Sequence, residues 1–108
     1  MPRGNRYFLP GRTYHLNHRC HNRQFLLRFA RDRDAYRLAL WEGLRSTPVW
    51  LLAYCITCNH THLLARSNDE LGIQTLMQRT EGRFAQYYNR RKERSGAFWE
   101  GRYHCTLI

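Results

Sequence analysis

Two histidines separated by a single residue are the first side chains in this sequence that could do chemistry. His60 and His62 lie in the segment HTHLLAR, whose pattern predicts a strand. Side chains two positions apart on a strand project from the same face, so the two imidazoles could bind one metal ion. Two neutral imidazoles and one oxygen ligand suit a divalent ion that keeps open positions, and such an ion can polarise a phosphate ester. The alternative is a pair of surface histidines that binds nothing.

Two cysteines precede the histidines and indicate a second kind of metal site. Cys55 and Cys58 complete the pattern C-x-x-C-x-H-x-H, and a hairpin that carries C-x-x-C can hold Zn²⁺. Cys55 falls in a segment that we expect to be buried, where apolar packing is the ordinary fate of a cysteine. Zn²⁺ on this set, in a zinc-stapled interaction domain, is therefore the alternative to a divalent ion on the histidine pair alone.

The cations of the chain are almost all arginine. Eighteen Lys and Arg residues stand against eight Asp and Glu residues, Lys92 is the single lysine, and the net charge is +10. The guanidinium fork grips phosphate in a bidentate way and stacks on bases, so this bias favours nucleic acid as the partner. An arginine bias that comes only from the codons of a GC-rich genome is the alternative.

The candidate DNA-binding residues fall into two sets. The first is a basic arm made of Arg3, Arg6 and Arg12. In the second, cations lie near aromatic residues that could stack unpaired bases. Its members are Arg83, Arg90, Arg91, Arg94, Trp99 and Arg102. A solvated helix face is the alternative for this second set.

Length and composition predict one compact domain over residues 1–108. Of these residues 43% are hydrophobic, so the chain can form a core. No apolar run approaches the roughly 18 residues that a membrane span needs, and the first residues lack the apolar stretch of a signal peptide. We therefore expect a cytoplasmic protein with reduced cysteines.

Hydrophobic periodicity predicts the element order βαββαβ. We expect strands over 14–20, 49–57, 60–66 and 98–108, and helices over 32–46 and from 67–70 to about 94, with Gly96 as a C-terminal cap. The segment 49–57, VWLLAYCIT, is nearly all apolar and predicts a strand buried on both faces. Alternation along it puts Cys55 on the face opposite Trp50, Leu52, Tyr54 and Ile56.

This order is that of the ferredoxin-like fold, in the α+β class, with one antiparallel four-stranded sheet and two helices on one face. The open face should carry His15, Asn17, His60 and His62, and Thr61, Leu63 and Ala65 should face the helices.

A longer stretch around the histidine pair resembles a known family. The segment YCITCNHTHLLA, residues 54–65, is similar to the YxxMPNHxHLL segment of HUH single-strand endonucleases, in particular REP-associated tyrosine transposases and their IS200-like relatives. The stretches MPRGNR at the start, LMQRTEGRFAQ at 76–86 and YYNRRKERSGAFWEGRY at 87–103 support this, so the resemblance covers the chain in order. Two departures are Thr61, where a hydrophobic residue is usual, and Thr57-Cys58, where Met-Pro is usual.

The resemblance implies DNA transposition. Family members cut single-stranded or hairpin DNA with a tyrosine that stays attached as a 5′-phosphotyrosine, assisted by Mg²⁺ or Mn²⁺. His60 and His62 would bind that ion together with a polar residue from the tyrosine helix. This helix follows the last strand, so we expect the nucleophile to lie beyond Ile108 and this chain to bind DNA without cleaving it.

Two further possibilities are open at this point. Tyr87 and Tyr88 are the candidates for a nucleophile within the chain, but both lie on the apolar stripe of the second helix, where packing is the expected role. The protein could also be a non-catalytic nucleic-acid-binding module. RNA-binding sheets of this fold carry exposed aromatic residues on their central strands, where this chain has polar residues and histidines.

Overall fold

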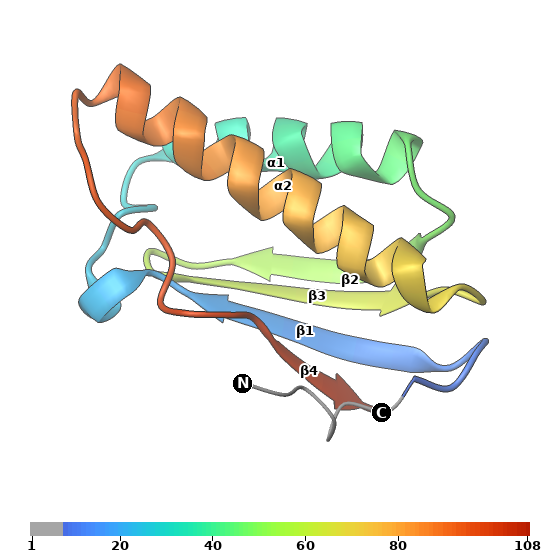
Figure 1. Ribbon diagram of the computed structural model, residues 1–108. Helices are drawn as coiled ribbons and strands as arrows, with labels where there is room; N and C mark the ends of the chain where they lie inside the picture. The colour runs from blue at the N-terminus through green and yellow to red at the C-terminus, as the bar shows by residue number, and fades with distance from the viewer. Residues whose placement is uncertain (1–7) are drawn as a thin grey trace.

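Four strands form one antiparallel sheet, and two helices cover one of its faces (Figure 1). The computed structural model describes residues 8–108. In chain order the elements are β1 (Thr13–Arg19), a short 3-10 helix η1 (His21–Arg23), α1 (Ala30–Arg45), β2 (Trp50–Ile56), β3 (His60–Arg66), α2 (Glu70–Arg91) and β4 (His104–Leu107). The strands lie in the order β2-β3-β1-β4. This arrangement confirms the predicted ferredoxin-like α+β plan.

The two central strands, β1 and β3, define the two faces of the sheet. On β3, Thr61, Leu63 and Ala65 are fully buried on the helix side, and the residues between them are only half-buried. β1 alternates in the same way. Its buried side chains are Tyr14, Leu16 and His18, and its half-buried ones include His15, Asn17 and Arg19. The structure thus places the histidine pair on the helix-free face, as the two-residue period predicts.

The prediction that residues 49–57 form a strand buried on both faces is wrong. β2 lies at the edge of the sheet and has one neighbour, β3. Trp50, Leu52 and Tyr54 are 57%, 54% and 46% exposed. An apolar run does not by itself distinguish a central strand from an edge strand, since that depends on which strands pair.

A bulge in β2 also changes which of its residues share a face. The register with β3 shifts between Leu51 and Ala53, so Leu52 has no cross-strand partner. Extra residues of this kind reverse the alternation of the strand on one side of the bulge. As a result Trp50 lies on the same face as Cys55, because their partners on β3 are Arg66 and His62. The predicted opposition of Trp50 and Cys55 is therefore wrong.

The last part of the chain contains less strand than predicted. Only His104–Leu107 pairs with β1, whereas residues 98–108 were expected to form the strand. Phe98 is buried in the core, and Trp99 makes a single bridge with Cys20. The aromatic residues of this segment are therefore used for packing between the layers.

The end of α2 also differs from the prediction. The helix is capped at Lys92, and the residue after it, Glu93, has a positive φ of 52°. Gly96, the expected cap, has a φ of 93° but lies in the connection beyond the helix. At the other end Asp69 is the N-cap, and its side chain accepts a hydrogen bond from the backbone N–H of Leu71.

No helix within residues 8–108 has the length and apolar character required to cross a membrane.

A glycine allows the two helices to pack closely. A Cβ atom added to Gly43 of α1 would lie 2.5 Å from Thr80 Oγ1 and 3.0 Å from Leu76 Cδ1, both on α2. Thr80 and Leu76 are fully buried, so neither side chain has space to move away. The spacing of the helical layer over the sheet therefore depends on the missing methyl group at this position.

We expect Gly43→Ala to lower the free energy of unfolding by about 1–3 kcal/mol, because an added methyl in a packed core forces its neighbours to shift. Gly82→Ala on α2 is the matched control. No atom lies within 4 Å of its added Cβ, so it should stabilise the helix by roughly 0.5–1 kcal/mol. Urea denaturation followed by circular dichroism measures both. Equal effects of the two substitutions would contradict the close packing at Gly43.

Candidate metal and nucleic-acid site

The histidine pair lies near the hairpin turn that joins β2 and β3. His60 and His62 are both half-buried, and their ring centres are 5.7 Å apart with the planes 13° from parallel. They share a face because Thr61 between them is fully buried against the helices. The regular pairing of β3 with β1 on one side and β2 on the other fixes this orientation.

Each ring of the pair has a hydrogen-bond partner at its Nδ1 atom. His60 Nδ1 lies 2.8 Å from Asn59 Oδ1, and His62 Nδ1 lies 3.1 Å from Nε2 of His15 on β1. No hydrogen bond between the Nε2 atom of either ring and a described protein group is present. Sequence reasoning placed His15 on this face but missed both contacts, which depend on side-chain geometry.

The cross-strand neighbours of His62 are Asn17 on β1 and Cys55 on β2. Cys55 is exposed, which corrects the expectation of apolar packing, since the edge position of β2 leaves its open face uncovered. Asn17 Oδ1 is buried and has no hydrogen-bond partner. An oxygen atom without a partner next to an imidazole is the kind of donor that a hard divalent ion uses.

The zinc alternative is not supported by the arrangement of these side chains. Within residues 8–108, no group of three or more His, Cys, Asp and Glu side chains is placed to bind a metal ion. The set Cys55, Cys58, His60 and His62 thus does not converge.

Electrostatics favour the neutral form of both rings. Burial, followed by the charges of Arg19 and Arg23, lowers the pKa of His60 below its usual value of 6.5. Burial, followed by the charges of His15 and His60, lowers the pKa of His62. A neutral imidazole has a free lone pair, so both rings are able to bind a metal ion at neutral pH.

Two arginines beside the pair were not among the predicted site residues. Arg19 is the cross-strand partner of His60, and its Nε atom is buried without a hydrogen-bond partner. Arg23 belongs to η1, which follows β1 after one residue. Arg19 shares a face of β1 with His15 and Asn17, and this alternation could have identified Arg19 as a site residue from the sequence. The position of Arg23 depends on a turn with φ values of 53° and 56° at Asn22 and Arg23, which the sequence did not indicate.

Some of the residues predicted to bind DNA are exposed in the structure, and others make contacts within the protein. Arg83 and Arg90 are exposed on α2, Arg102 is exposed before β4, and Arg12 is exposed before β1. Arg3 and Arg6 lie outside the described residues.

Two other predicted DNA-binding arginines make internal contacts. Arg91 pairs with Asp32, a residue of α1 that is only 1% exposed, and Lys92 lies 3.5 Å from the same carboxylate. Arg94 donates to Asn89 Oδ1 and to the carbonyl of Ala97. These contacts hold the C-terminal end of α2 against α1 and against the segment that follows the helix.

The tyrosines of residues 8–108 lie away from the histidine face. Tyr88 is 6% exposed, and burial raises the pKa of its hydroxyl. Tyr87 is 44% exposed but lines a hollow between α1 and α2 with Leu38 and Phe84. The others, Tyr14, Tyr36, Tyr54 and Tyr103, lie on the helix side of the sheet or within the helical layer.

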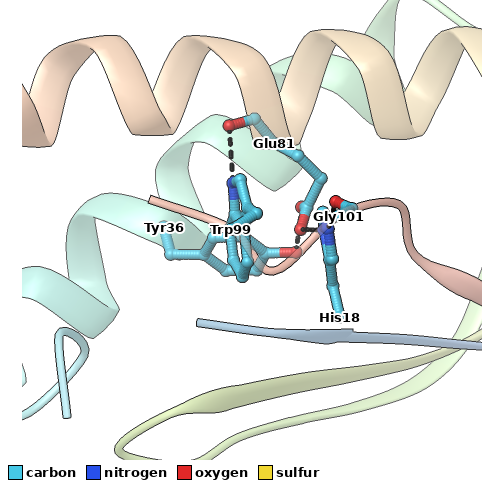
Figure 2. Close-up of polar contacts among 5 residues, drawn as sticks. All are labelled: His18, Tyr36, Glu81, Trp99 and Gly101. Atoms are coloured by element: carbon cyan, nitrogen blue, oxygen red, sulfur yellow. Dashed lines mark hydrogen bonds and ion pairs between the residues drawn. The ribbon is translucent and has the colours of Figure 1, made fainter. Parts of the chain in front are cut away.

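Trp99 takes part in a buried polar network that joins the two layers (Figure 2). Its Nε1–H donates to the backbone carbonyl of Glu81 on α2, and its ring stacks on His18 of β1 with centres 4.3 Å apart. The Glu81 side chain accepts a 2.6 Å hydrogen bond from the Tyr36 hydroxyl of α1 and lies 2.8 Å from His18 Nδ1. Trp99, which was predicted to bind DNA, is half-buried and packs against His18 and α2.

The protonation of this network follows from its partners. His18 Nε2 lies 2.9 Å from the carbonyl of Gly101, which can only accept, so Nε2 carries a proton. One further proton lies between His18 Nδ1 and Glu81 Oε2, both of which are about 95% buried. The contact is thus charge-assisted or a carboxylic acid donating to a neutral ring, and in both forms every polar atom of the pair has a partner.

The chain thus combines a basic ferredoxin-like domain with a His-x-His pair on the open face of its sheet. The sequence model of the IS200-like transposases, Y1_Tnp, matches residues 10–108, and the chain belongs to this family.

Two solved structures share the fold. One is a REP-associated tyrosine transposase bound to a REP hairpin, with a TM-score of 0.79 and 17% identity. The match covers 100% of this chain but 62% of that one, so this chain spans less than two thirds of its length. The other is a proposed transposase from Deinococcus radiodurans R1, with a TM-score of 0.73 and 18% identity over 100% of this chain and 86% of that one. No curated protein matches the sequence.

We expect Glu81→Ala to lower the free energy of unfolding by about 3–5 kcal/mol, because it leaves His18 and the Tyr36 hydroxyl buried without their partner. Glu81→Gln keeps an acceptor for Tyr36 and should cost clearly less. The measurement is urea denaturation of both variants at pH 7. A Glu81→Ala protein as stable as the parent would show that the network does not hold the two layers together.

Proposed function

We propose that this chain is the DNA- and metal-binding core of a transposase that acts on single-stranded or hairpin DNA. His60 and His62 bind one Mg²⁺ or Mn²⁺ ion through Nε2, and DNA phosphate lies against the same face. The observation that carries the proposal is that His60 and His62 lie side by side on the open face, each with its Nδ1 atom engaged by a neighbour. Membership of the IS200-like transposase family supports the DNA substrate.

The residues present fit a divalent ion. Both rings are neutral at pH 7 because their pKa values are lowered, and the partnerless oxygen of Asn17 lies opposite His62. An ion bound here would polarise a phosphate ester and offset the charge that develops on its oxygens. His60 and His62 would hold the ion, and the pairing of β3 with β1 and β2 keeps their geometry fixed.

The phosphate partner is supported by the charge around the pair. Arg19 and Arg23 lie close enough to His60 to lower its pKa. A guanidinium beside a metal ion is a common arrangement for an anionic oxygen, which it binds by a charge-assisted hydrogen bond. We infer that these two arginines hold the DNA backbone at the ion. The exposed arginines Arg12, Arg83, Arg90 and Arg102 would extend the contact.

The kind of DNA is inferred from the family and from one structural relative. The REP-associated tyrosine transposase of similar fold is bound to a REP hairpin. For this chain we propose a DNA hairpin, since the exposed arginines suit its phosphates and Trp99, the predicted base-stacking residue, is engaged in packing.

The affinity for a labelled DNA hairpin should fall steeply as salt rises, because each phosphate contact releases counterions. Arg19→Ala should weaken binding and reduce the slope of log K against log salt by about 1. Arg37→Ala is the control, since Arg37 pairs with Asp34 on α1 and contacts Tyr54 on the helix side of the sheet, opposite the histidine face. Fluorescence anisotropy from about 50 to 200 mM salt measures this. A slope that Arg19→Ala leaves unchanged would remove Arg19 from the DNA contact.

With Mn²⁺ and a single-stranded hairpin substrate, this chain should form no covalent DNA adduct. In-line attack requires a tyrosine oxygen at the scissile phosphate, and Tyr87 and Tyr88 belong to α2 on the far side of the sheet from His60. The measurement is a denaturing gel with end-labelled DNA, run beside Tyr87→Phe and Tyr88→Phe. A shifted band that one of these variants abolishes would show that the chain carries its own nucleophile.

A further inference from the structure

We propose that Asn59 and His15 are positioning residues that set the tautomers of His60 and His62. Each holds the proton of its partner ring on Nδ1, which leaves both Nε2 lone pairs free for one ion. This inference rests on the proposed metal-binding function of the pair. It assigns a role to two side chains that the DNA contact and the metal ligands do not use.

The tautomer of His60 follows from a chain of three groups. Asn59 Nδ2 lies 3.2 Å from the carbonyl oxygen of Arg23, which can only accept, so the amide nitrogen of Asn59 must face Arg23. The amide oxygen Oδ1 then faces His60 Nδ1 at 2.8 Å and can only accept. His60 Nδ1 must therefore be the donor. A neutral ring with its proton on Nδ1 has its lone pair on Nε2.

Backbone hydrogen bonds hold Asn59 in place. Its carbonyl accepts from the N–H of Cys20 at 2.9 Å, and the carbonyl of Cys58 accepts from the N–H of Leu27 at 2.8 Å. Its own N–H lies 3.4 Å from Thr57 Oγ1. The hairpin turn is thus tied to the segment after β1, and the side chain of Asn59 cannot leave His60 without breaking the contact with Arg23.

The contact of His15 with His62 is a hydrogen bond made edge to edge. The rings are 2° from parallel with centres 5.3 Å apart, but the facing nitrogens are only 3.1 Å apart. The two rings therefore lie in one plane with their nitrogens facing each other. In this geometry the lone pair of one nitrogen points at the N–H of the other. Either ring can be the donor. Only the form in which His62 Nδ1 donates to His15 Nε2 leaves His62 Nε2 free for a metal ion.

Such outer contacts matter for metal affinity. A ligating histidine almost always donates its other N–H to a neighbour, which fixes the orientation of the ring and raises its basicity, and loss of the neighbour costs about 10- to 100-fold in metal affinity. Asn59 meets this requirement for His60 because its amide oxygen, which faces the ring, can only accept a hydrogen bond. His15 meets it for His62 by accepting a hydrogen bond from His62 Nδ1–H, so the four side chains form two matched donor–acceptor pairs around one ion.

Ring-nitrogen NMR on the metal-free chain at neutral pH tests the tautomers directly. Long-range ¹H–¹⁵N correlation distinguishes a protonated ring nitrogen from one with a lone pair. We expect His60 and His62 to be protonated at Nδ1, with Nε2 of both and of His15 unprotonated. A proton on Nε2 of His60 would overturn the role of Asn59. A proton on Nε2 of His62 would overturn that of His15.

Substitutions separate positioning from folding. Asn59→Leu and His15→Phe should reduce Mn²⁺ affinity by about 10- to 100-fold and return their partner rings to a mixture of tautomers. Asn59→Asp and His15→Gln each keep an acceptor and should restore the Nδ1–H form and most of the affinity. The controls are Asn68→Leu, at an exposed position, and His21→Phe, whose ring is half-buried in η1 and pairs with Glu100. Affinity is read from Mn²⁺-induced line broadening of the His60 and His62 resonances.

The two proposals fail in different ways. If the parent chain shows no broadening with Mn²⁺ while its rings have the expected tautomers, the metal function is wrong and the tautomer assignment stands. If Mn²⁺ binds equally well to the parent, Asn59→Leu and His15→Phe, the metal function stands and the positioning role is wrong. Loss of affinity in the control variants as well would also overturn the positioning role.

Discussion

The pairing of β1 with β3 is the constraint on which the rest of the structure depends. These central strands bury Tyr14, Leu16, Leu63 and Ala65 on one side, and the two-residue period then forces His15, Asn17, His60 and His62 onto the other. A shift of one residue in either strand would exchange the core with the histidine face. The hydrophobic energy of the core therefore also fixes the position of the candidate metal ligands.

The buried carboxylate of Glu81 connects the layers above that sheet. It links α1 through Tyr36, β1 through His18 and, by its backbone carbonyl, the segment before β4 through Trp99 (Figure 2). Buried polar groups are costly when a partner is lost, so this network specifies one arrangement of helices, sheet and connecting segment. The segment between α2 and β4 has little regular structure and is held by these contacts.

The open face combines neutral imidazoles with guanidinium groups. The charges of Arg19 and Arg23 disfavour a proton on His60, and the same charges favour an anionic oxygen next to it. The same two charges therefore keep the lone pair of His60 free of a proton and attract a phosphate group. Asn59 belongs to both parts, because it joins His60 to the backbone of Arg23.

The sequence alone determined the features that depend on local period: the order of the elements, the helix-facing residues of β1 and β3, the shared face of His60 and His62, and the family. It could not determine the edge position and bulge of β2, the packing role of Trp99 or the burial of Asp32, because each depends on which distant segments pair. The contacts of Asn59 with Arg23 and of His15 with His62 span 36 and 47 positions. Only the tertiary structure brings such residues within hydrogen-bond distance. Local sequence patterns do not say which distant side chains will point toward one another.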